Sequence, residues 1–152
     1  MPLTPILTAH WDEADSHTIE GYRRHGGYDM VPVTFGAHPD EVIALVKESG
    51  LRGRGGAGFP TAIKMGAIRK IGDGKRFVVC NFSEGEPATF KDRLLTRSNP
   101  YLMVEGIAIS AHALGTDTAI IGIKKVHERE IEMTRRAIED FQASGLFDWL
   151  NI

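Results

Sequence analysis

The sequence contains a single cysteine, Cys80, among its 152 residues. One thiol excludes an internal disulfide framework. It also excludes an iron–sulfur cluster or structural zinc site built from the cysteines of this chain alone. No apolar run approaches the roughly 18 residues that a membrane-spanning helix needs. Residues 1–12 lack the basic-then-apolar order of a signal peptide. We therefore expect a cytoplasmic protein that does not insert into a membrane.

The sequence also lacks an excess of positive charge, because its net charge is -2. A nucleic-acid or membrane-surface partner would favour a basic face, so no nucleic-acid partner is expected. We interpret Lys124 and Lys125 as solvated helix charges. No Ser/His/Asp or Cys/His arrangement indicates a nucleophile. The histidines show no metal-ligand spacing and are interpreted as structural or solvent-facing, so no metal site is expected: His10, His17, His25, His38, His112 and His127.

What the sequence does contain is an alternation of helical and strand-like segments. Helical spacing marks residues 18–24, 40–49, 62–70, 100–114 and 126–143, and strand-like apolar runs mark residues 76–80 and 118–123. This order predicts an α/β fold, with a parallel sheet flanked by helices. Pro32 and Pro39 are expected to interrupt regular structure. We interpret residues 1–38 as an N-terminal lead-in and residues 39–152 as the α/β domain.

The most informative segment, which we call the glycine loop, is LRGRGGAGFPT at residues 51–61. Its glycines permit positive φ and leave the backbone bare. Consecutive N–H groups can then converge on an anion, and a flat ring can lie against the chain. Arg52 and Arg54 add positive charge, and Lys64 lies about one turn into the following helix, whose N-terminus suits a phosphate. The pattern matches neither the dinucleotide-binding nor the Walker fingerprint. A flexible linker is the alternative, although a linker does not need Phe59.

A second polar segment, which we call the acidic loop, is residues 81–92, directly after the strand-like run that ends at Cys80. Ligands of α/β proteins gather beyond the carboxyl ends of strands, so this loop is placed for binding. Asn81 offers donors and an acceptor to a heterocycle, while Glu84 and Glu86 can accept hydrogen bonds from ribose hydroxyls. The alternative is a solvated turn, for which Gly85 is an ordinary residue.

Together, GLRGRGGAGFPT at residues 50–61, Lys64, and CNFSEGEPATFKDR at residues 80–93 resemble one family. It is the NADH-binding, FMN-carrying flavoprotein subunit of respiratory complex I, with related NAD-reducing hydrogenases and NAD-dependent formate dehydrogenases. The likeness runs from about residue 40 onward. It implies a Rossmann-like fold of the FMN-binding-domain type, incomplete at the C-terminus, with FMN and NAD(H) as cofactors.

The resemblance also implies roles for individual residues. The glycine loop would pack against the flavin and dinucleotide, with Phe59 stacking on adenine, through four residues: Gly55, Gly56, Ala57 and Phe59. FMN would be bound by Arg54, Lys64 and Asn81. Glu84 would be the catalytic carboxylate beside the stacked flavin and nicotinamide. Glu86 would contact the ribose or the adenine side of NADH.

Three residues depart from the family pattern. Ser83, at a position that contacts FMN, stands where the family usually has an acidic residue. Met65 and Ala67 stand where the family usually has aromatic residues, next to the expected adenine stack.

The function that the resemblance implies is hydride transfer between NAD(H) and FMN, in which the flavin supplies the reactivity. Electrons would then pass to iron–sulfur clusters outside this chain. We therefore expect an iron–sulfur partner subunit or a further C-terminal portion, a location in the cytoplasm or peripherally on a membrane complex, and no turnover by this chain alone. One alternative is a split or remnant nucleotide-binding or docking module without turnover. Another is a phosphate-binding module unrelated to redox chemistry.

Overall fold

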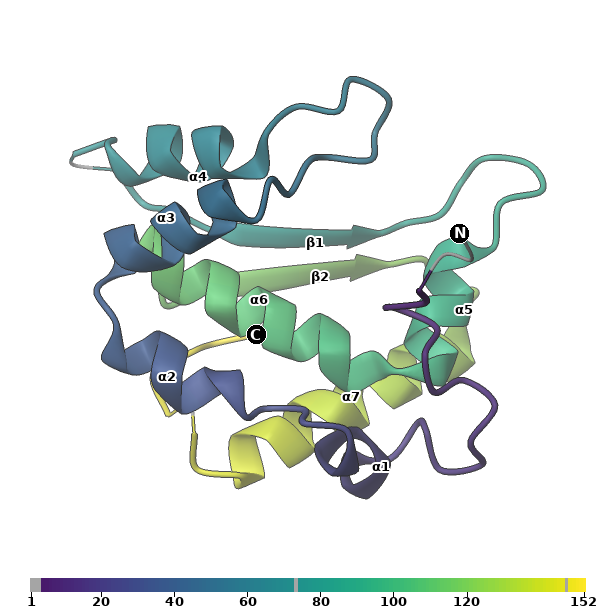
Figure 1. Ribbon diagram of the computed structural model, residues 1–152. Coiled ribbons are helices and arrows are strands. Elements are labelled where there is room, and N and C mark those ends of the chain that lie inside the picture. Colours follow the sequence, from purple (N-terminus) through teal and green to yellow (C-terminus); the bar gives the residue numbers. More distant parts are fainter. Residues whose placement is uncertain (1–3, 73, 147) are drawn as a thin grey trace.

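The computed structural model describes residues 4–72, 74–146 and 148–152 (Figure 1). Within these residues the chain is a mixed α/β fold with seven helices and two strands. The elements in order are α1 (Ile19–Arg24), α2 (Met30–Gly36), α3 (Pro39–Glu48), α4 (Thr61–Arg69), β1 (Val78–Phe82), α5 (Lys91–Ser98), α6 (Pro100–Leu114), β2 (Ala119–Ile123) and α7 (Glu128–Ala143). No helix of the described part is both long and apolar enough to cross a membrane. The predicted α/β class is confirmed at this level.

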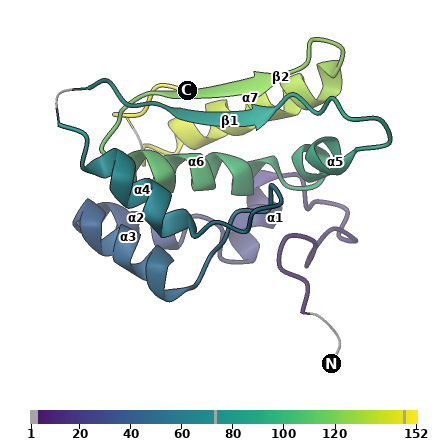
Figure 2. The same cartoon turned by 90° about the horizontal axis from the view of Figure 1, so that it is seen from above.

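The two strands pair in parallel, with Val78 opposite Ala119 and Phe82 opposite Ile123. Helices α5 and α6 form the crossover that a parallel pair requires. After α7 the chain returns beside the start of β2, where Thr118 forms a parallel bridge with Asn151. Both strands point the same way, so the loops that follow them emerge at one end of the sheet (Figures 1 and 2).

Helix α6 lies at the centre of the fold and packs against β1 and most of the other helices (Figure 2). The side chain of Asn99 accepts a hydrogen bond from the backbone N–H of Leu102 at 3.1 Å, which begins the helix. Gly115, with a φ of 67°, ends it in the left-handed conformation. Residues on several faces of α6 are buried, as expected for a helix that is apolar nearly all round. The predicted bounds of this helix are confirmed.

The hydrophobic core joins α6 and α7 to residues that the sequence assigned to the lead-in. The ring centroid of Tyr28 lies 5.3 Å from that of Phe141 on α7. The carboxylate of Glu105 on α6 accepts hydrogen bonds from the Tyr22 hydroxyl and, at 3.1 Å, from the Tyr28 backbone N–H. Burial, together with the hydrogen bond to Glu105, raises the pKa of Tyr22 above its ordinary range. Together with the buried Val31, Tyr22 and Tyr28 are therefore part of the same core as α6.

Two helices were not predicted. Pro32 was expected to interrupt regular structure, but it lies in the first turn of α2, where its missing N–H would have no helical partner in any case. Helix α5 follows the acidic loop, and its sequence, KDRLLTRS, carries little apolar signal. Lys124 and Lys125, interpreted as helix charges, instead lie between β2 and the first residue of α7, Glu128.

Candidate functional site

The glycine loop connects α3 to α4, and its two ends lie side by side (Figure 1). Two backbone hydrogen bonds hold its base: the N–H of Thr61 donates to the carbonyl of Leu51 at 3.0 Å, and the N–H of Gly53 donates to the carbonyl of Phe59 at 2.9 Å. In both views the loop reaches the level of the carboxyl end of β1 (Figures 1 and 2). These bonds disfavour the alternative of an unstructured linker.

The glycines at the tip of the loop face open space. Gly56 and Gly58 have φ values of 104° and 58°, in the region that side chains rarely adopt. Gly55 is not among the residues with positive φ, and a Cβ atom built on it meets no other atom within 4 Å. The packing of the described chain therefore does not require glycine at position 55. Its bare backbone is available to something outside the chain.

Phe59 and Lys64 lie together at the start of α4. The Phe59 side chain is exposed, and the Lys64 ammonium lies 5.5 Å from its ring centroid. No side chain caps the N-terminus of α4, which follows Pro60. Arg54 and Lys64 are both exposed. A helix N-terminus with a lysine in its first turn favours a bound anion, and phosphate is the anion that such ends most often hold.

The acidic loop is tied to the carboxyl end of the second strand. The Asn81 side chain accepts a hydrogen bond from the Ser83 N–H at 2.9 Å, which fixes the turn. The Ser83 hydroxyl donates to the carbonyl of Gly122 on β2 at 3.3 Å. A Cβ atom on Gly85 would lie 3.4 Å from the ammonium of Lys124. Lys124 is thus a cation at this edge that the sequence analysis missed, although its position directly after a strand was a usable signal.

Glu84, the predicted catalytic residue, points into the protein. Its side chain is only 2% exposed. The carboxylate accepts the backbone N–H of Asp92 at 3.0 Å and the Arg93 guanidinium at 3.2 Å. Burial alone raises the pKa of Glu84, but the hydrogen bonds from Asp92 and Arg93 outweigh it and hold the pKa below its ordinary value. Glu84 therefore anchors the start of α5, and its role beside a flavin stays a prediction.

This anchoring predicts that Glu84→Gln lowers the free energy of unfolding by about 1–3 kcal/mol at neutral pH. The pKa is lowered on folding, so the stabilisation is complete above the unfolded value of about 4.3 and disappears as the pH falls through the folded value. Urea unfolding at neutral and acidic pH measures this difference. The exposed Glu86 is the matched control, and Glu86→Gln should change stability little. Equal losses for both variants would contradict the anchoring role.

The other predicted residues do not converge on one enclosed cavity. Glu86 is exposed in the acidic loop. Within the described residues, no hydrogen bond or ion pair joins the glycine loop to the acidic loop. A cavity of about 920 Å³ lies near the opposite end of the strands, lined by Phe77, His112 and Trp149 among others, and it contains none of the predicted site residues. The candidate site is therefore an open edge formed by two loops.

Comparison with known families identifies this part of the chain. Residues 46–151 match the family model described as the Nuo51 FMN-binding domain. The matched range contains the glycine loop, both strands and the acidic loop.

Relatives and solved structures agree with that match. The chain is 43% identical over 144 residues to an NADH-quinone oxidoreductase subunit of Streptomyces coelicolor, covering 94% of this chain and 32% of the relative. It is 40% identical over 142 residues to an NADH-quinone oxidoreductase subunit of Rhizobium meliloti, covering 93% and 34%. The crystal structure of an air-oxidised NAD⁺-reducing [NiFe]-hydrogenase superposes with a TM-score of 0.74 at 33% identity, covering 93% of this chain and 23% of that chain. The chain thus spans about a third of the length of these curated relatives.

Proposed function

Because the chain belongs to the Nuo51 FMN-binding domain family, we propose that it binds FMN and takes part in hydride transfer between NAD(H) and that flavin. Residues 39–152 would form the Rossmann-like nucleotide-binding domain, and residues 1–38 would lead into it while adding Tyr22, Tyr28 and Val31 to its core. The observation that carries the proposal is the glycine loop, whose bare backbone at Gly55 faces open space that nothing in the described chain fills.

The residues of the glycine loop and α4 fit the phosphate end of FMN. Arg54 and Lys64 would supply positive charge to a phosphate at the uncapped N-terminus of α4, and all three features would attract a phosphate dianion. The backbone at Gly55 and Gly56 leaves room for a flat ring. Ala57 lies between Gly56 and Gly58, and its side chain is a single methyl group, which would leave the loop backbone open to the same ring. When bound, FMN would supply the hydride chemistry, and these residues would hold and orient it.

The acidic loop and Phe59 fit the remaining polar and aromatic groups. Asn81 and Ser83, at the carboxyl end of β1, would meet the edge of the flavin. Phe59 is exposed and would stack on adenine, while Glu86 would accept hydrogen bonds from ribose hydroxyls. Glu84 would act on the nicotinamide side only if its carboxylate were released from Asp92 and Arg93.

The electrons of this reaction would leave through iron–sulfur clusters outside the chain, in a partner subunit or in a further part of the same subunit. The names of the relatives support the presence of partner subunits, because they are subunits of NADH-quinone oxidoreductase. We place this assembly in the cytoplasm or peripherally on a membrane complex.

The sharpest test of the proposal is a titration with FMN followed by amide NMR. A flavin pocket normally covers most of its ligand, so two open loops should bind FMN weakly, and NMR detects weak binding. We expect FMN to shift the signals of residues 51–64. Gly55→Val should weaken binding by at least about tenfold, equivalent to about 1.4 kcal/mol, because the added side chain occupies the approach.

The matched control is Gly36→Val at the end of α2, where a Cβ atom also meets nothing within 4 Å. This variant should bind FMN like the unmodified chain. Unchanged FMN affinity in a folded Gly55→Val variant would remove the glycine loop from the site.

One observation favours the second candidate, a nucleotide-binding or docking module without turnover. The carboxylate predicted to be catalytic is turned inward and held by Asp92 and Arg93. The same titration recognises a module that only docks, because such a module would give no shifts in the glycine loop with FMN or NADH. A module that binds the nucleotide without turnover would give the shifts, and it is recognised by the absence of NADH oxidation with ferricyanide once the iron–sulfur partner or further portion is supplied.

A further inference from the structure

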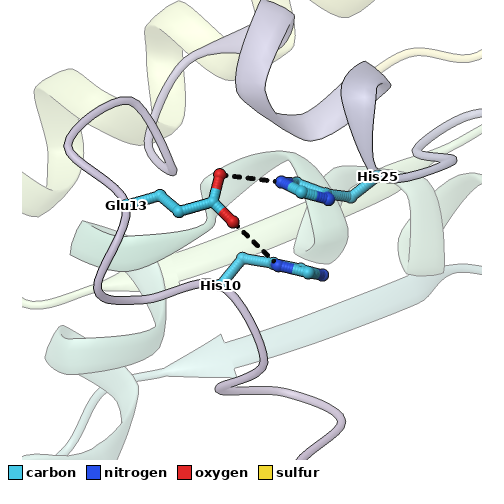
Figure 3. A group of neighbouring side chains, drawn as sticks. All are labelled: His10, Glu13 and His25. Atoms are coloured by element: carbon cyan, nitrogen blue, oxygen red, sulfur yellow. Dashed lines mark hydrogen bonds and ion pairs between the residues drawn. The ribbon is translucent and has the colours of Figure 1, made fainter.

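A second polar cluster lies near the N-terminus, away from the glycine loop. Figure 3 shows the side chains of His10, Glu13 and His25 converging from the segment before α1 and from the residue that follows α1. The two oxygens of the Glu13 carboxylate are shared between the rings. Nδ1 of His10 lies 3.0 Å from Oε1, and Nε2 of His25 lies 2.8 Å from Oε2. The spacing of these residues in the sequence gave no signal, because a turn in the segment brings them together.

The distances between the three ligand atoms suit a small metal ion. These atoms all lie within 4.8 Å of one another. Zinc binds nitrogen and oxygen ligands at about 2.0–2.2 Å, which puts ligand atoms of a tetrahedral site about 3.3 Å apart. The imidazole planes are stacked, with centroids 3.5 Å apart and an interplanar angle of 8°. A metal accepts the lone pair that lies in each ring plane, so one ion can bind both rings only if they tilt towards each other.

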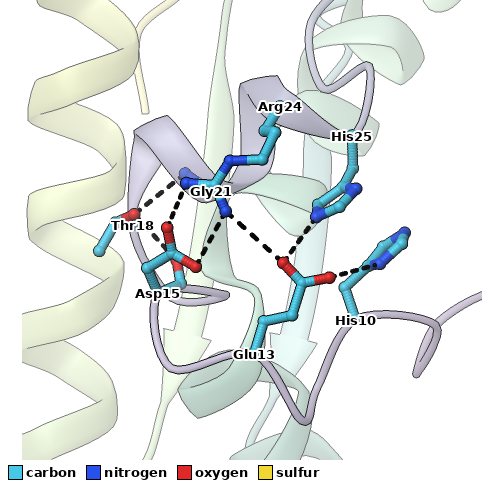
Figure 4. Close-up of polar contacts among 7 residues, drawn as sticks. All are labelled: His10, Glu13, Asp15, Thr18, Gly21, Arg24 and His25. Atoms are coloured by element: carbon cyan, nitrogen blue, oxygen red, sulfur yellow. Dashed lines mark hydrogen bonds and ion pairs between the residues drawn. The ribbon is translucent and has the colours of Figure 1, made fainter.

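Neighbouring charges leave the Glu13 carboxylate available. Figure 4 shows Arg24 between the carboxylates of Asp15 and Glu13. The guanidinium lies 2.5 Å from Asp15 and 3.6 Å from Glu13, so its closer partner is Asp15. Arg24 can therefore keep an ion pair with Asp15 while Glu13 binds a cation.

The cluster also borders an open space. His10 and His25 line a cavity of about 440 Å³, together with Leu102 and Ile109 of α6. Two of the three ligands therefore face open space, where a metal held by three protein ligands would keep a fourth position for water or another small ligand.

We propose that His10, Glu13 and His25 form a binding site for a divalent first-row transition metal ion, with zinc as its representative. Two imidazoles and one carboxylate are a ligand set that such ions prefer, whereas Mg²⁺ and Ca²⁺ prefer oxygen ligands alone. On binding, each neutral ring carries its proton on the nitrogen that does not face the metal, and the hydrogen bonds to Glu13 are replaced by metal–ligand bonds. Figure 1 shows α1 at the opposite side of the molecule from the glycine loop, so this site is separate from the proposed FMN site.

The test is a competition between the untagged 152-residue chain and a chromophoric chelator for Zn²⁺. We expect one Zn²⁺ per chain and no competing effect of Mg²⁺. Glu13→Gln and His25→Gln should each weaken Zn²⁺ binding by at least about tenfold, because each removes one of three ligands. Circular dichroism of each variant shows whether it is folded. Zn²⁺ should also raise the unfolding temperature of the unmodified chain but not of the variants.

Two control variants make the result specific. His17 is exposed in the same segment. His38 offers a different pair of zinc ligands with Asp40, because its Nδ1 lies 3.6 Å from Oδ2 of that carboxylate. His17→Gln and His38→Gln should bind Zn²⁺ like the unmodified chain. The proposal is overturned if the unmodified chain binds no Zn²⁺, if folded Glu13→Gln and His25→Gln variants bind it with unchanged affinity, or if His38→Gln is the variant that loses it.

Discussion

Replacing Phe141 by alanine is expected to lower the free energy of unfolding by about 3–5 kcal/mol. Phe141 is completely buried, and its ring packs edge-to-face with that of Tyr28 from the N-terminal part of the chain. The substitution removes apolar burial and leaves a cavity between α7 and the segment that contains Tyr28. Urea unfolding followed by far-ultraviolet circular dichroism measures the loss.

Phe90→Ala is the matched control for this experiment. Phe90 is 61% exposed, just before α5, so its removal should change stability by less than about 0.5 kcal/mol. A loss of less than about 0.5 kcal/mol for Phe141→Ala as well would mean that Phe141 is not a core residue.

The second large effect is expected at Glu105, where alanine should cost about 2–5 kcal/mol. The substitution leaves the Tyr22 hydroxyl and the Tyr28 N–H buried without the acceptor that they share. Both donors precede residue 39, so the loss should also loosen the connection between the N-terminal part and α6. Urea unfolding gives the stability, and limited trypsin digestion at Arg23 should become faster in the variant.

Glu132→Ala on α7 provides the comparison, because Glu132 is exposed. It should leave both the stability and the digestion pattern nearly unchanged. If Glu105→Ala destabilises the protein without faster cleavage at Arg23, then residues before α3 do not depend on this carboxylate.

The parts of the fold that could be predicted from the sequence are those whose signal is local. Helix α6 has a proline in its first turn, a capping Asn99 and a terminal Gly115, and its predicted bounds match the structure. Helix α5 has no comparable start or stop signal in its own sequence. Contacts with other parts of the chain hold it in place instead. Glu84 holds its first turn, and Arg97 near its end forms an ion pair with the buried Glu130 on α7. Such contacts between distant residues cannot be recognised in a single sequence.

The same limit applies to the candidate site. The sequence located both loops, because glycine clusters and residues that follow strands are local features. It could not show that Glu84 points inward while Glu86 points outward, since two glutamates separated by one residue look equivalent in a polar loop. Nor could it show that His10 and His25 meet, because a turn that is not regular secondary structure brings them together.

Glycines occur in the glycine loop for two different reasons, backbone conformation and space for a ligand, which the sequence alone cannot distinguish. Gly56 and Gly58 have backbone angles that disfavour any side chain, so their identity is partly a requirement of the loop itself. Gly55 has neither that constraint nor a close neighbour. A substitution at Gly55 therefore reports on a ligand more directly than one at Gly56, where strain and steric exclusion would be mixed.

The parallel pairing of β1 with β2 also implies an order of events during folding. The acidic loop, α5 and α6 lie between the two strands, so strand hydrogen bonds cannot form until this stretch has brought β2 back beside β1. Closing so long a loop costs conformational entropy before any contact between the strands offsets it. Helix α6 carries its own start and stop signals and has local hydrogen bonds, so we expect it to be structured first. The arrival of β2 beside β1 is then the slow step.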